Sequence, residues 1–350
     1  GTRYRRGGSH REPAVSIVVR YPGRACLLGE HCDWAGGASL AMPLAQGVRI
    51  TAEPAATGLR IRTLLDGRLR EGSWPVAGAI ERDGGPLRFV PAAAAALWAR
   101  GIQIPPVLLW ADSDLPAGRG FSSSAAFCLA VLDALSRHAG APLDPAALAE
   151  LAFHVEHALL GVACGRLDPL ACVAGAPVLL RWDQQGRAPL RRLWPCQPLH
   201  FVVAAFPKAR DTGRILAALN RYLHADLRAP EHPEAVAAVR EAITIFASEA
   251  ERAAPALEAG DAAALGGCMN RAQTAYARMA AHVPALSAPG LARAVLALKS
   301  AGAYGAKFSG AGGDGSVIAV FPDAATAQAS QLQLERDHGL SAWTRTLEEQ

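Results

Sequence analysis

The alternation of apolar and polar positions predicts a strand-rich first half of the chain. The short apolar run Val15–Val19 predicts a buried strand that ends in a turn at Tyr21-Pro22-Gly23. The segments 47–53 and 58–63 alternate as strands of an antiparallel sheet do. Further strands are expected at 107–110, 178–181 and 200–205.

Helical periodicity dominates the rest of the chain. Residues 145–160 place their apolar positions on one face, with Asp144 as the N-cap and Pro145 in the first turn. Further helices are expected over 90–100, 123–138, 212–225, 233–253, 261–281 and 290–301, and from 324 onward. This order predicts an α+β protein of two packed domains, 15–190 and 191–350, with a cleft between them and a flexible tail at 1–14.

Composition excludes several classes of protein. Of the 350 residues, 51% are hydrophobic and 19% charged, the reverse of the balance in disordered chains. No apolar run reaches the ~18 residues of a membrane helix, so we expect a cytoplasmic protein with no membrane partner. The net charge of +4 comes from scattered arginines, which argues against a nucleic-acid partner. The seven cysteines form no CxxC pair, which argues against a disulfide scaffold or a structural zinc site.

Four functional side chains crowd the segment PGRACLLGEHCDWAGG, residues 22–37. Arg24, Glu30, His31 and Asp33 lie within ten residues. Such a set suits a polyhydroxylated ligand, because each sugar hydroxyl both donates and accepts hydrogen bonds. A charged surface turn fits the composition equally well. His31 and Asp33 are also consistent with half of a metal site, although no third ligand is evident.

A loop of small residues, DLPAGRGFSSSAA over 114–126, runs directly into an apolar helix. Backbone N–H groups at a helix start, unobstructed by side chains, bind anions, and serine hydroxyls reach phosphate oxygens or a metal held by them. The alternative is a serine that only caps a core helix. Three serines after two glycines exceed what capping needs, so we interpret the loop as a phosphate site.

A second glycine-rich segment, SGAGGDG over 309–315, matches G-x-G-x-x-G literally. The dinucleotide fingerprint must open a helix, whereas the strand-like SVIAVF follows here, and no lysine precedes Ser316 as it would in a P-loop. Neither nucleotide motif fits. A turn at close backbone approach to a ligand remains, against a simple hairpin connection.

Two carboxylates complete the candidate chemistry. Glu156 falls on the helix expected over 145–160, and Asp168 lies just past its end. Together they suit a metal ligand and a base, although Glu156 alone is more often a solvated helix carboxylate. His154 and His157 flank Glu156, but HVEH is not the HExxH of zinc hydrolases.

In this order the segments resemble the GHMP kinase superfamily, which includes galactokinase, homoserine kinase, mevalonate kinase and phosphomevalonate kinase. The resemblance covers residues 15–345. PGRACLLGEHCDWAGG is similar to the galactokinase sugar signature, GFSSSAA to the second motif, and SGAGGDGS to the third motif in its mevalonate kinase form. The resemblance implies two lobes: an N-terminal mixed sheet with packed helices, and a helix-rich, ferredoxin-like C-terminal α+β domain. The active site would lie in the cleft between them.

The resemblance also implies roles for single residues. Asp168 would be the catalytic base or orienting carboxylate, and Arg24 would stabilise the developing alkoxide and the phosphoryl group. Sugar hydroxyls would be bound by Glu30, His31 and Asp33, with help from the backbone of Gly165. The assigned ATP-binding residues are Gly118, Gly120, Ser122, Ser123, Ser124, Gly310 and Gly312, and the assigned Mg²⁺ ligands are Ser124 and Glu156.

These roles imply an ATP- and Mg²⁺-dependent kinase that phosphorylates the anomeric hydroxyl of a monosaccharide. A superfamily kinase for an amino-acid or isoprenoid alcohol stays open, as the third motif suggests. So does a silent sugar-and-ATP sensor with a protein partner, although the intact Arg24, Glu156 and Asp168 argue against it.

Several positions depart from the family pattern around the acceptor pocket and the phosphate loops, and Arg166-Leu167 in place of Ile-Met is one departure. The galactokinase segment that carries a sugar-contacting tyrosine has no recognisable counterpart over 208–222. Asp314 replaces a glycine in the third motif, Arg119 stands inside the phosphate loop where the family has a small residue, and Pro169 follows Asp168 in place of glutamine. A carboxylate at position 314 is unfavourable near phosphates unless it faces away or touches a metal.

Overall fold

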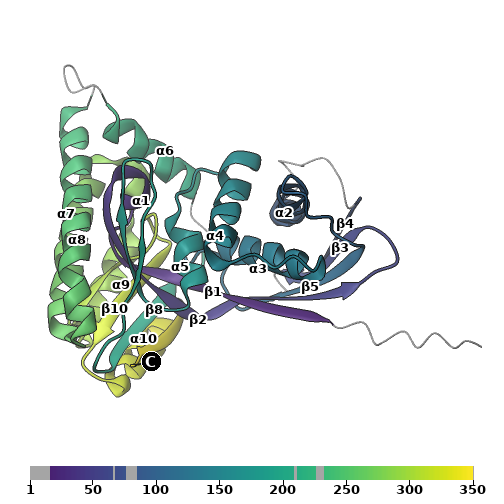
Figure 1. Ribbon diagram of the computed structural model, residues 1–350. Helices are drawn as coiled ribbons and strands as arrows, with labels where there is room; N and C mark the ends of the chain where they lie inside the picture. The colour runs from purple at the N-terminus through teal and green to yellow at the C-terminus, as the bar shows by residue number, and fades with distance from the viewer. Residues whose placement is uncertain (1–15, 66–67, 76–84, 209–210, 226–231, 350) are drawn as a thin grey trace, which may run out of the picture.

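The computed structural model describes residues 16–65, 68–75, 85–208, 211–225 and 232–349. The chain forms two lobes, each built round its own sheet, as Figure 1 shows. The two-lobed α+β architecture expected from the sequence is confirmed. No helix in the described part of the chain is both long and apolar enough to cross a membrane.

The first lobe holds a mixed seven-stranded sheet of order β4-β3-β5-β2-β6-β7, with β1 paired to β2 off this path. Every pairing is antiparallel except that of β3 with β5. The strands are β1 Ile17–Leu28, β2 Gly37–Pro54, β3 Leu59–Leu65, β4 Arg68–Trp74, β5 Val107–Ser113, β6 Val178–Trp182 and β7 Leu190–Arg192. Its helices are α2 Phe89–Trp98, α3 Ser123–His138, α4 Pro145–His154 and α5 Leu167–Ala174; a π-helical turn, Val155–Leu159, extends α4.

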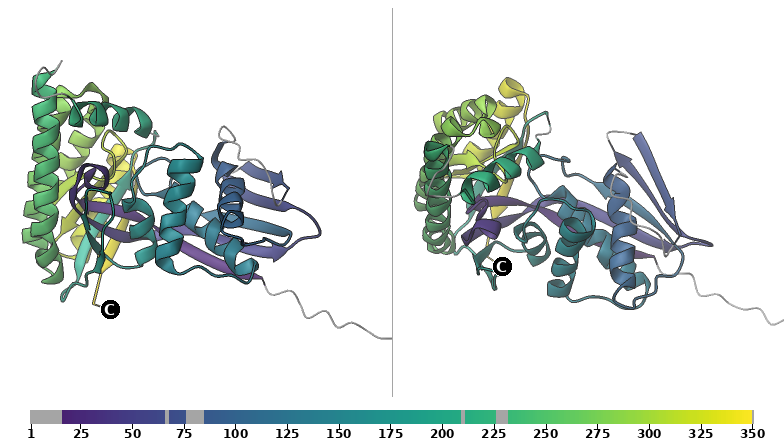
Figure 2. Two further views of the ribbon diagram at one scale, coloured as in Figure 1. Left: turned by 45° about the horizontal axis from the view of Figure 1, so that its top comes forward. Right: turned by 90° about the horizontal axis from the view of Figure 1, so that it is seen from above.

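The second lobe holds an antiparallel four-stranded sheet of order β11-β8-β10-β9. The strands are β8 Leu199–Ala205, β9 Gly305–Phe308, β10 Ser316–Phe321 and β11 Ser341–Leu347. The helices are α6 Thr212–Leu223, α7 Pro233–Glu258, α8 Ala262–His282, α9 Pro289–Ser300 and α10 Ala324–His338. The long α7 and α8 lie side by side along the outer edge of this lobe in both views of Figure 2. The chain passes from the first sheet to the second between Arg192 and Leu199, and the domain limit at 190 stays a prediction.

The expected end of the first strand at residues 21–23 is wrong. β1 continues to Leu28 with an irregularity in its register between Pro22 and Arg24. Pro22 lies opposite Gly47, where an added Cβ would stand only 2.4 Å from the Tyr21 carbonyl oxygen. Because Gly47 leaves room for close approach, the strand absorbs Pro22-Gly23 as a bulge instead of turning. The continued strand carries Arg24 to the boundary between the lobes.

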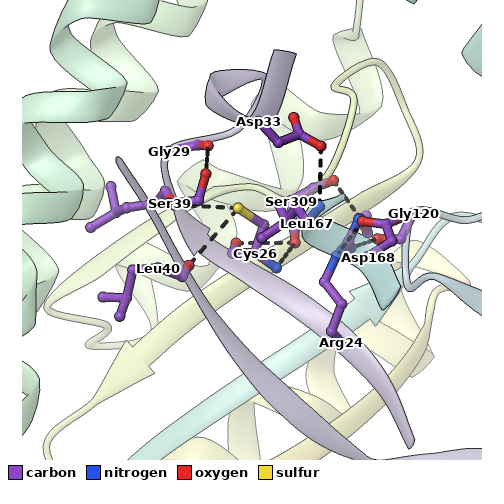
Figure 3. A network of polar contacts seen from close by, with 12 residues as sticks. Arg24, Cys26, Gly29, Asp33, Ser39, Leu40, Gly120, Leu167, Asp168 and Ser309 are labelled. Carbon is purple, nitrogen blue, oxygen red and sulfur yellow. Dashed lines mark hydrogen bonds and ion pairs between the residues drawn. The ribbon is translucent and has the colours of Figure 1, made fainter. Parts of the chain in front are cut away.

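Helix α1 (Cys32–Ala35) is a single turn that joins β1 to β2. It places the predicted acidic segment against the second lobe, because α1 contacts α7. Ser309, at the end of β9, ties the lobes together at the same level: its Oγ accepts from the Cys26 amide at 3.0 Å and donates to the Cys26 carbonyl at 3.1 Å (Figure 3). The start of the third motif is thereby fixed to β1.

Candidate active site

A cavity of about 600 Å³ lies between the lobes and collects residues from both. Its wall includes all but one of the predicted site residues: Arg24, Glu30, His31, Asp33, Gly118, Gly120, Ser122, Ser123, Ser124, Glu156, Gly165, Asp168 and Gly310. Gly312 is the exception among these described residues; a Cβ added to it would meet the Tyr276 ring at 2.7 Å. Its expected contact with ATP stays a prediction, and close packing against Tyr276 inside the second lobe also requires a glycine here.

Arg24 and Asp168 meet in this wall although 144 residues separate them. The Nε of Arg24 donates to Asp168 Oδ1 at 2.9 Å, and its Nη2 donates to the same oxygen. Its Nη1 donates to the Gly120 carbonyl at 2.6 Å, so the guanidinium also holds the phosphate loop (Figure 3). Although burial opposes it, the charge of Asp168 raises the pKa of Arg24 above its ordinary value.

The position of Asp168 differs from the expected one. It follows the preceding helix, as expected, but it stands in the first turn of α5, a helix that the sequence analysis did not predict. An acidic residue in a first helical turn is favoured by the free N–H groups there. Its side chain is partly exposed to the cavity while that of Arg24 is buried, so Asp168 is the group that a ligand can reach.

Asp33 secures the loop before α5. Its Oδ2 accepts from the Leu167 amide at 3.4 Å (Figure 3). A Cβ on Gly165 would stand 1.9 Å from the same oxygen, so only glycine lets the carboxylate approach this loop. Burial first, and then the nearby charge of Asp168, raise the pKa of Asp33 to about 6.

Two non-glycine residues in the described chain have a positive φ, and both belong to this wall. They are His31 at 68° and Ser122 at 59°. A positive φ is energetically unfavourable for a residue other than glycine, and it persists only where the surrounding structure holds the backbone in place. Such positions are common at functional sites. His31 precedes α1 and Ser122 precedes α3, so both strained positions aim a helix start at the cavity.

The phosphate loop does not use its serine as an ordinary cap. Ser122 occupies the N-cap position of α3, but its side chain caps no backbone N–H group. Its Oγ is buried and has no hydrogen-bond partner among the described residues. The alternative of a serine that only caps a core helix is therefore wrong. The start of a 16-residue helix, with Gly118 and Gly120 before it, remains open toward the cavity.

Glu156 is suited to hold a cation. Only 2% of it is exposed, and its Oε1 has no hydrogen-bond partner in the described structure. Burial raises its pKa to about 7; a hydrogen bond from Ser124 opposes this, and the charge of Asp168 adds to it. It lies on the π-helical turn after α4, a distortion common at functional sites.

A metal here would need oxygens from a ligand as well as from the protein. The described residues hold no cluster of three His, Cys, Asp or Glu side chains placed to bind a metal, so His31 and Asp33 have no third such ligand among them. A carboxylate and a hydroxyl fit Mg²⁺, which usually takes one or two protein oxygens together with phosphate oxygens. Ser124 and Glu156 therefore fit the predicted ion.

The sequence analysis missed two parts of the site. One face of α6 completes the cavity wall with Thr212, Gly213, Leu216, Ala217 and Asn220. Lys307 on β9 is fully buried and its Nζ donates to Glu30 Oε1. A lone lysine in the apolar stretch GAKF was the available signal for the second.

Asp314 and Arg119, the unusual residues of the glycine-rich loops, both serve structure. Asp314 accepts from the amides of Gly290 at 3.2 Å and Leu291 at 2.7 Å, so it caps the start of α9 and does not line the cavity. Arg119 donates to the Phe206 carbonyl, which links the phosphate loop to the second lobe.

Replacing Asp314 by alanine is expected to cost about 1 kcal/mol of stability, the usual value of a lost helix cap, and to leave the KM for ATP unchanged. Chemical denaturation and steady-state kinetics check both parts. Asp323→Ala is the matched control, because Asp323 caps α10 through the Thr326 amide at 2.8 Å. A change in the ATP KM confined to Asp314→Ala would place that carboxylate at the nucleotide after all.

Comparison with known proteins agrees with this geometry. Models described as the N-terminal and C-terminal domains of GHMP kinases match residues 88–176 and 253–339, and a galactokinase galactose-binding signature matches residues 7–54. A mevalonate kinase of Aeropyrum pernix is 28% identical over 86% of this chain and 87% of its own. A galactokinase of Chloroflexus aggregans is 29% identical over 87% and 83%, and one of Pyrococcus furiosus is 32% identical over 45% and 44%.

Solved structures show the same fold. Lactococcus lactis galactokinase complexed with galactose has a TM-score of 0.77 at 19% identity, covering 98% of this chain and 95% of its own. Methanococcus jannaschii mevalonate kinase has a TM-score of 0.76 at 16% identity, covering 97% and 100%. Sugar-kinase and mevalonate-kinase structures are thus equally similar in backbone, and the site itself must separate them.

Proposed function

The chain belongs to the GHMP kinase superfamily, and we propose that it transfers the terminal phosphoryl group of ATP to a hydroxyl, the anomeric one, of a monosaccharide without an acidic group. One observation carries the choice of acceptor: carboxylates line the cavity where the acceptor would lie, and no cation among the described wall residues is left to pair with an anion. Glu30, Asp33 and Asp168 are the acidic residues of that region.

The supply of positive charge is the decisive quantity. Among the described residues that line the cavity, only Arg24 carries a fixed positive charge, and it is already bonded to Asp168 and to the Gly120 carbonyl. Lys307 is committed to Glu30. An acceptor with its own carboxylate would face like charges and leave a buried anion unpaired, which is costly. Neutral hydroxyls instead donate to carboxylate oxygens without such a cost.

The residues of the site suggest how the transfer proceeds. The acceptor hydroxyl donates to the exposed part of Asp168, which orients it toward the terminal phosphate and takes its proton late in the transfer. A bond forms between the acceptor oxygen and the γ-phosphorus, the bond from that phosphorus to the β–γ bridging oxygen breaks, and ADP leaves. Arg24, held by Asp168 and Gly120, neutralises charge that develops between acceptor and phosphate.

The phosphate end is supplied by the first lobe. The start of α3 offers backbone N–H groups and the positive end of a helix dipole to the phosphates. Ser124 and Glu156 would hold Mg²⁺, which, when bound, neutralises phosphate charge. The buried Ser122 hydroxyl belongs to the cavity wall and would donate to a phosphate oxygen.

A panel of acceptors tests the assignment. We expect ADP release with at least one neutral sugar or amino sugar, and none above background with mevalonate or homoserine, because both carry a carboxylate. A coupled assay for ADP with galactose, other aldoses, amino sugars, cyclitols, mevalonate and homoserine measures this. Turnover confined to mevalonate or homoserine would overturn the sugar assignment while leaving the kinase assignment intact.

A kinase for a non-sugar alcohol is the second candidate. It is supported by the Aeropyrum pernix mevalonate kinase, which matches over 86% of this chain, and by the third motif. The charge of the acceptor region argues against it. Competition between mevalonate and sugars for the same site distinguishes the two, because only the true acceptor displaces the other at low concentration.

A further inference from the structure

A buried ion pair joins the two lobes beside the acceptor region. Lys307 comes from β9 of the second lobe and Glu30 from the turn after β1, 277 residues away. The exposed fractions of the two side chains are 0% and 1%. The lysine Nζ also donates to the Phe308 carbonyl and lies 4.3 Å from the centroid of the Phe308 ring. The ammonium is thus anchored within the second lobe before it reaches Glu30.

The anchor itself is rigid. The Phe308 ring stacks on Tyr276 at 4.2 Å and contacts Phe246 at 5.5 Å between centroids. These rings lie on α8 and α7, and Tyr276 donates to the Leu286 carbonyl at 2.9 Å. Aromatic packing of this kind leaves little freedom to the backbone beside it. The position of the Lys307 ammonium is therefore set by the core of the second lobe.

Glu30 uses only one of its two oxygens within the protein. Oε1 accepts from Lys307, whereas Oε2 is buried and has no hydrogen-bond partner among the described residues. Glu30 belongs to the cavity wall, and Lys307 does not. A buried ion pair contributes little net stability even when every lone pair is satisfied, and a half-satisfied one contributes less. The arrangement therefore points to a ligand for Oε2 and not to a staple for the fold.

We propose that Lys307 is a positioning residue for the acceptor: from the second lobe it holds the Glu30 carboxyl in a fixed orientation, so that Oε2 accepts a hydrogen bond from a substrate hydroxyl or ammonium group. The inference rests on the proposed function, because it takes the acceptor to be a molecule that donates a hydrogen bond through a hydroxyl or ammonium group. It adds that the acceptor contact depends on a cation from the opposite lobe. Burial raises the pKa of Glu30 above its ordinary value, although Lys307, a backbone N–H and the charge of Arg24 oppose the rise.

The test removes both charges together. Lys307→Met alone leaves a buried carboxylate unpaired and is expected to unfold the chain or protonate Glu30. The double variant Glu30→Gln/Lys307→Met leaves neither charge, and comparable replacements of buried pairs are often tolerated. We expect it to fold with a melting temperature near that of the wild type. Its KM for the sugar should rise at least tenfold, while its kcat and its KM for ATP stay within about threefold, because the lost contact binds the acceptor and does not move the phosphoryl group.

A second pair between the lobes provides the control. Arg181 on β6 binds Glu251 on α7 at 2.6 Å, but both side chains are exposed. The double variant Arg181→Met/Glu251→Gln should leave the KM for the sugar unchanged, because an exposed pair has little effect and this one lies off the cavity wall.

Each outcome decides. An unchanged sugar KM in Glu30→Gln/Lys307→Met, or failure of that variant to fold, assigns the pair to the scaffold and overturns the inference. The wild type is assayed in parallel with the same acceptors. If it turns over none of the sugars, the proposed function fails and the inference falls with it, whereas sugar turnover by the wild type with equal KM values in the double variant overturns the inference alone.

Discussion

Asp168→Asn is expected to lower kcat by about 10²- to 10⁴-fold while the KM for ATP changes less than about threefold. The amide keeps the shape of the side chain and can still accept from Arg24, which donates to Asp168 Oδ1 at 2.9 Å. It cannot take a proton from the acceptor hydroxyl, and loss of a positioned general base costs about that factor. Steady-state kinetics of ADP formation with a sugar identified by the acceptor panel measures the effect.

The matched control is Glu150→Gln. It makes the same change from carboxylate to amide, breaks a partly exposed ion pair with Arg166 at 3.0 Å, and lies outside the cavity wall. Its kcat should equal that of the wild type. A loss of less than about tenfold in Asp168→Asn would mean that this carboxylate only orients the hydroxyl, and an unchanged kcat would remove it from the reaction altogether.

Glu156→Gln is expected to stabilise the ligand-free protein against unfolding by about 3 kcal/mol at pH 8, and to remove most of the activity. The pKa of Glu156 is raised from 4.5 to about 7, mainly by burial, so the folded chain binds more protons than the unfolded chain between these values. Stability present below about pH 4.5 is therefore lost as the pH rises to 7, and the shift corresponds to about 3 kcal/mol. Glutamine has no charge to bury and avoids this loss.

Urea unfolding at pH 5 and pH 8 without nucleotide measures the effect. The two proteins should be close in stability at pH 5 and diverge at pH 8. The pKa of Asp33 is also raised, to about 6, so its ionisation lowers the stability of both proteins by the same amount as the pH rises. Glu241→Gln removes an exposed carboxylate whose ion pair with Arg278 spans 3.7 Å and should change neither value. Equal urea midpoints of the wild type and Glu156→Gln at pH 8 would show that ionisation of Glu156 does not lower the stability of the folded protein.

The same variant separates a metal ligand from a structural carboxylate. Added ATP and Mg²⁺ should raise the melting temperature of the wild type more than that of Glu156→Gln, because binding to the folded state alone stabilises it. Residues that are needed for activity often lower the stability of the ligand-free enzyme, and Glu156 would be one of them.

The sequence alone determined the features that depend on neighbouring residues. Asp144 and Pro145 predicted the start of α4, and Asp144 Oδ1 accepts from the Ala146 and Ala147 amides at 3.0 Å. The start of α3 after the glycine- and serine-rich loop was predicted for the same reason, since helix caps and turns are written in a few consecutive positions. The three motifs identified the superfamily because each carries its residues within one short segment.

Only the tertiary structure decided what depends on contacts between distant segments. Pro22-Gly23 is typical of a turn in the sequence, but Gly47 on the partner strand leaves room for a bulge there instead. The direction of Asp314 depends on α9, and the role of Lys307 depends on Glu30 in the other lobe. A local sequence pattern shows which chemical groups are present. Burial, charge pairing and the wall of a cavity depend instead on which distant segments pack together. Such packing brings Arg24 to Asp168 across 144 residues.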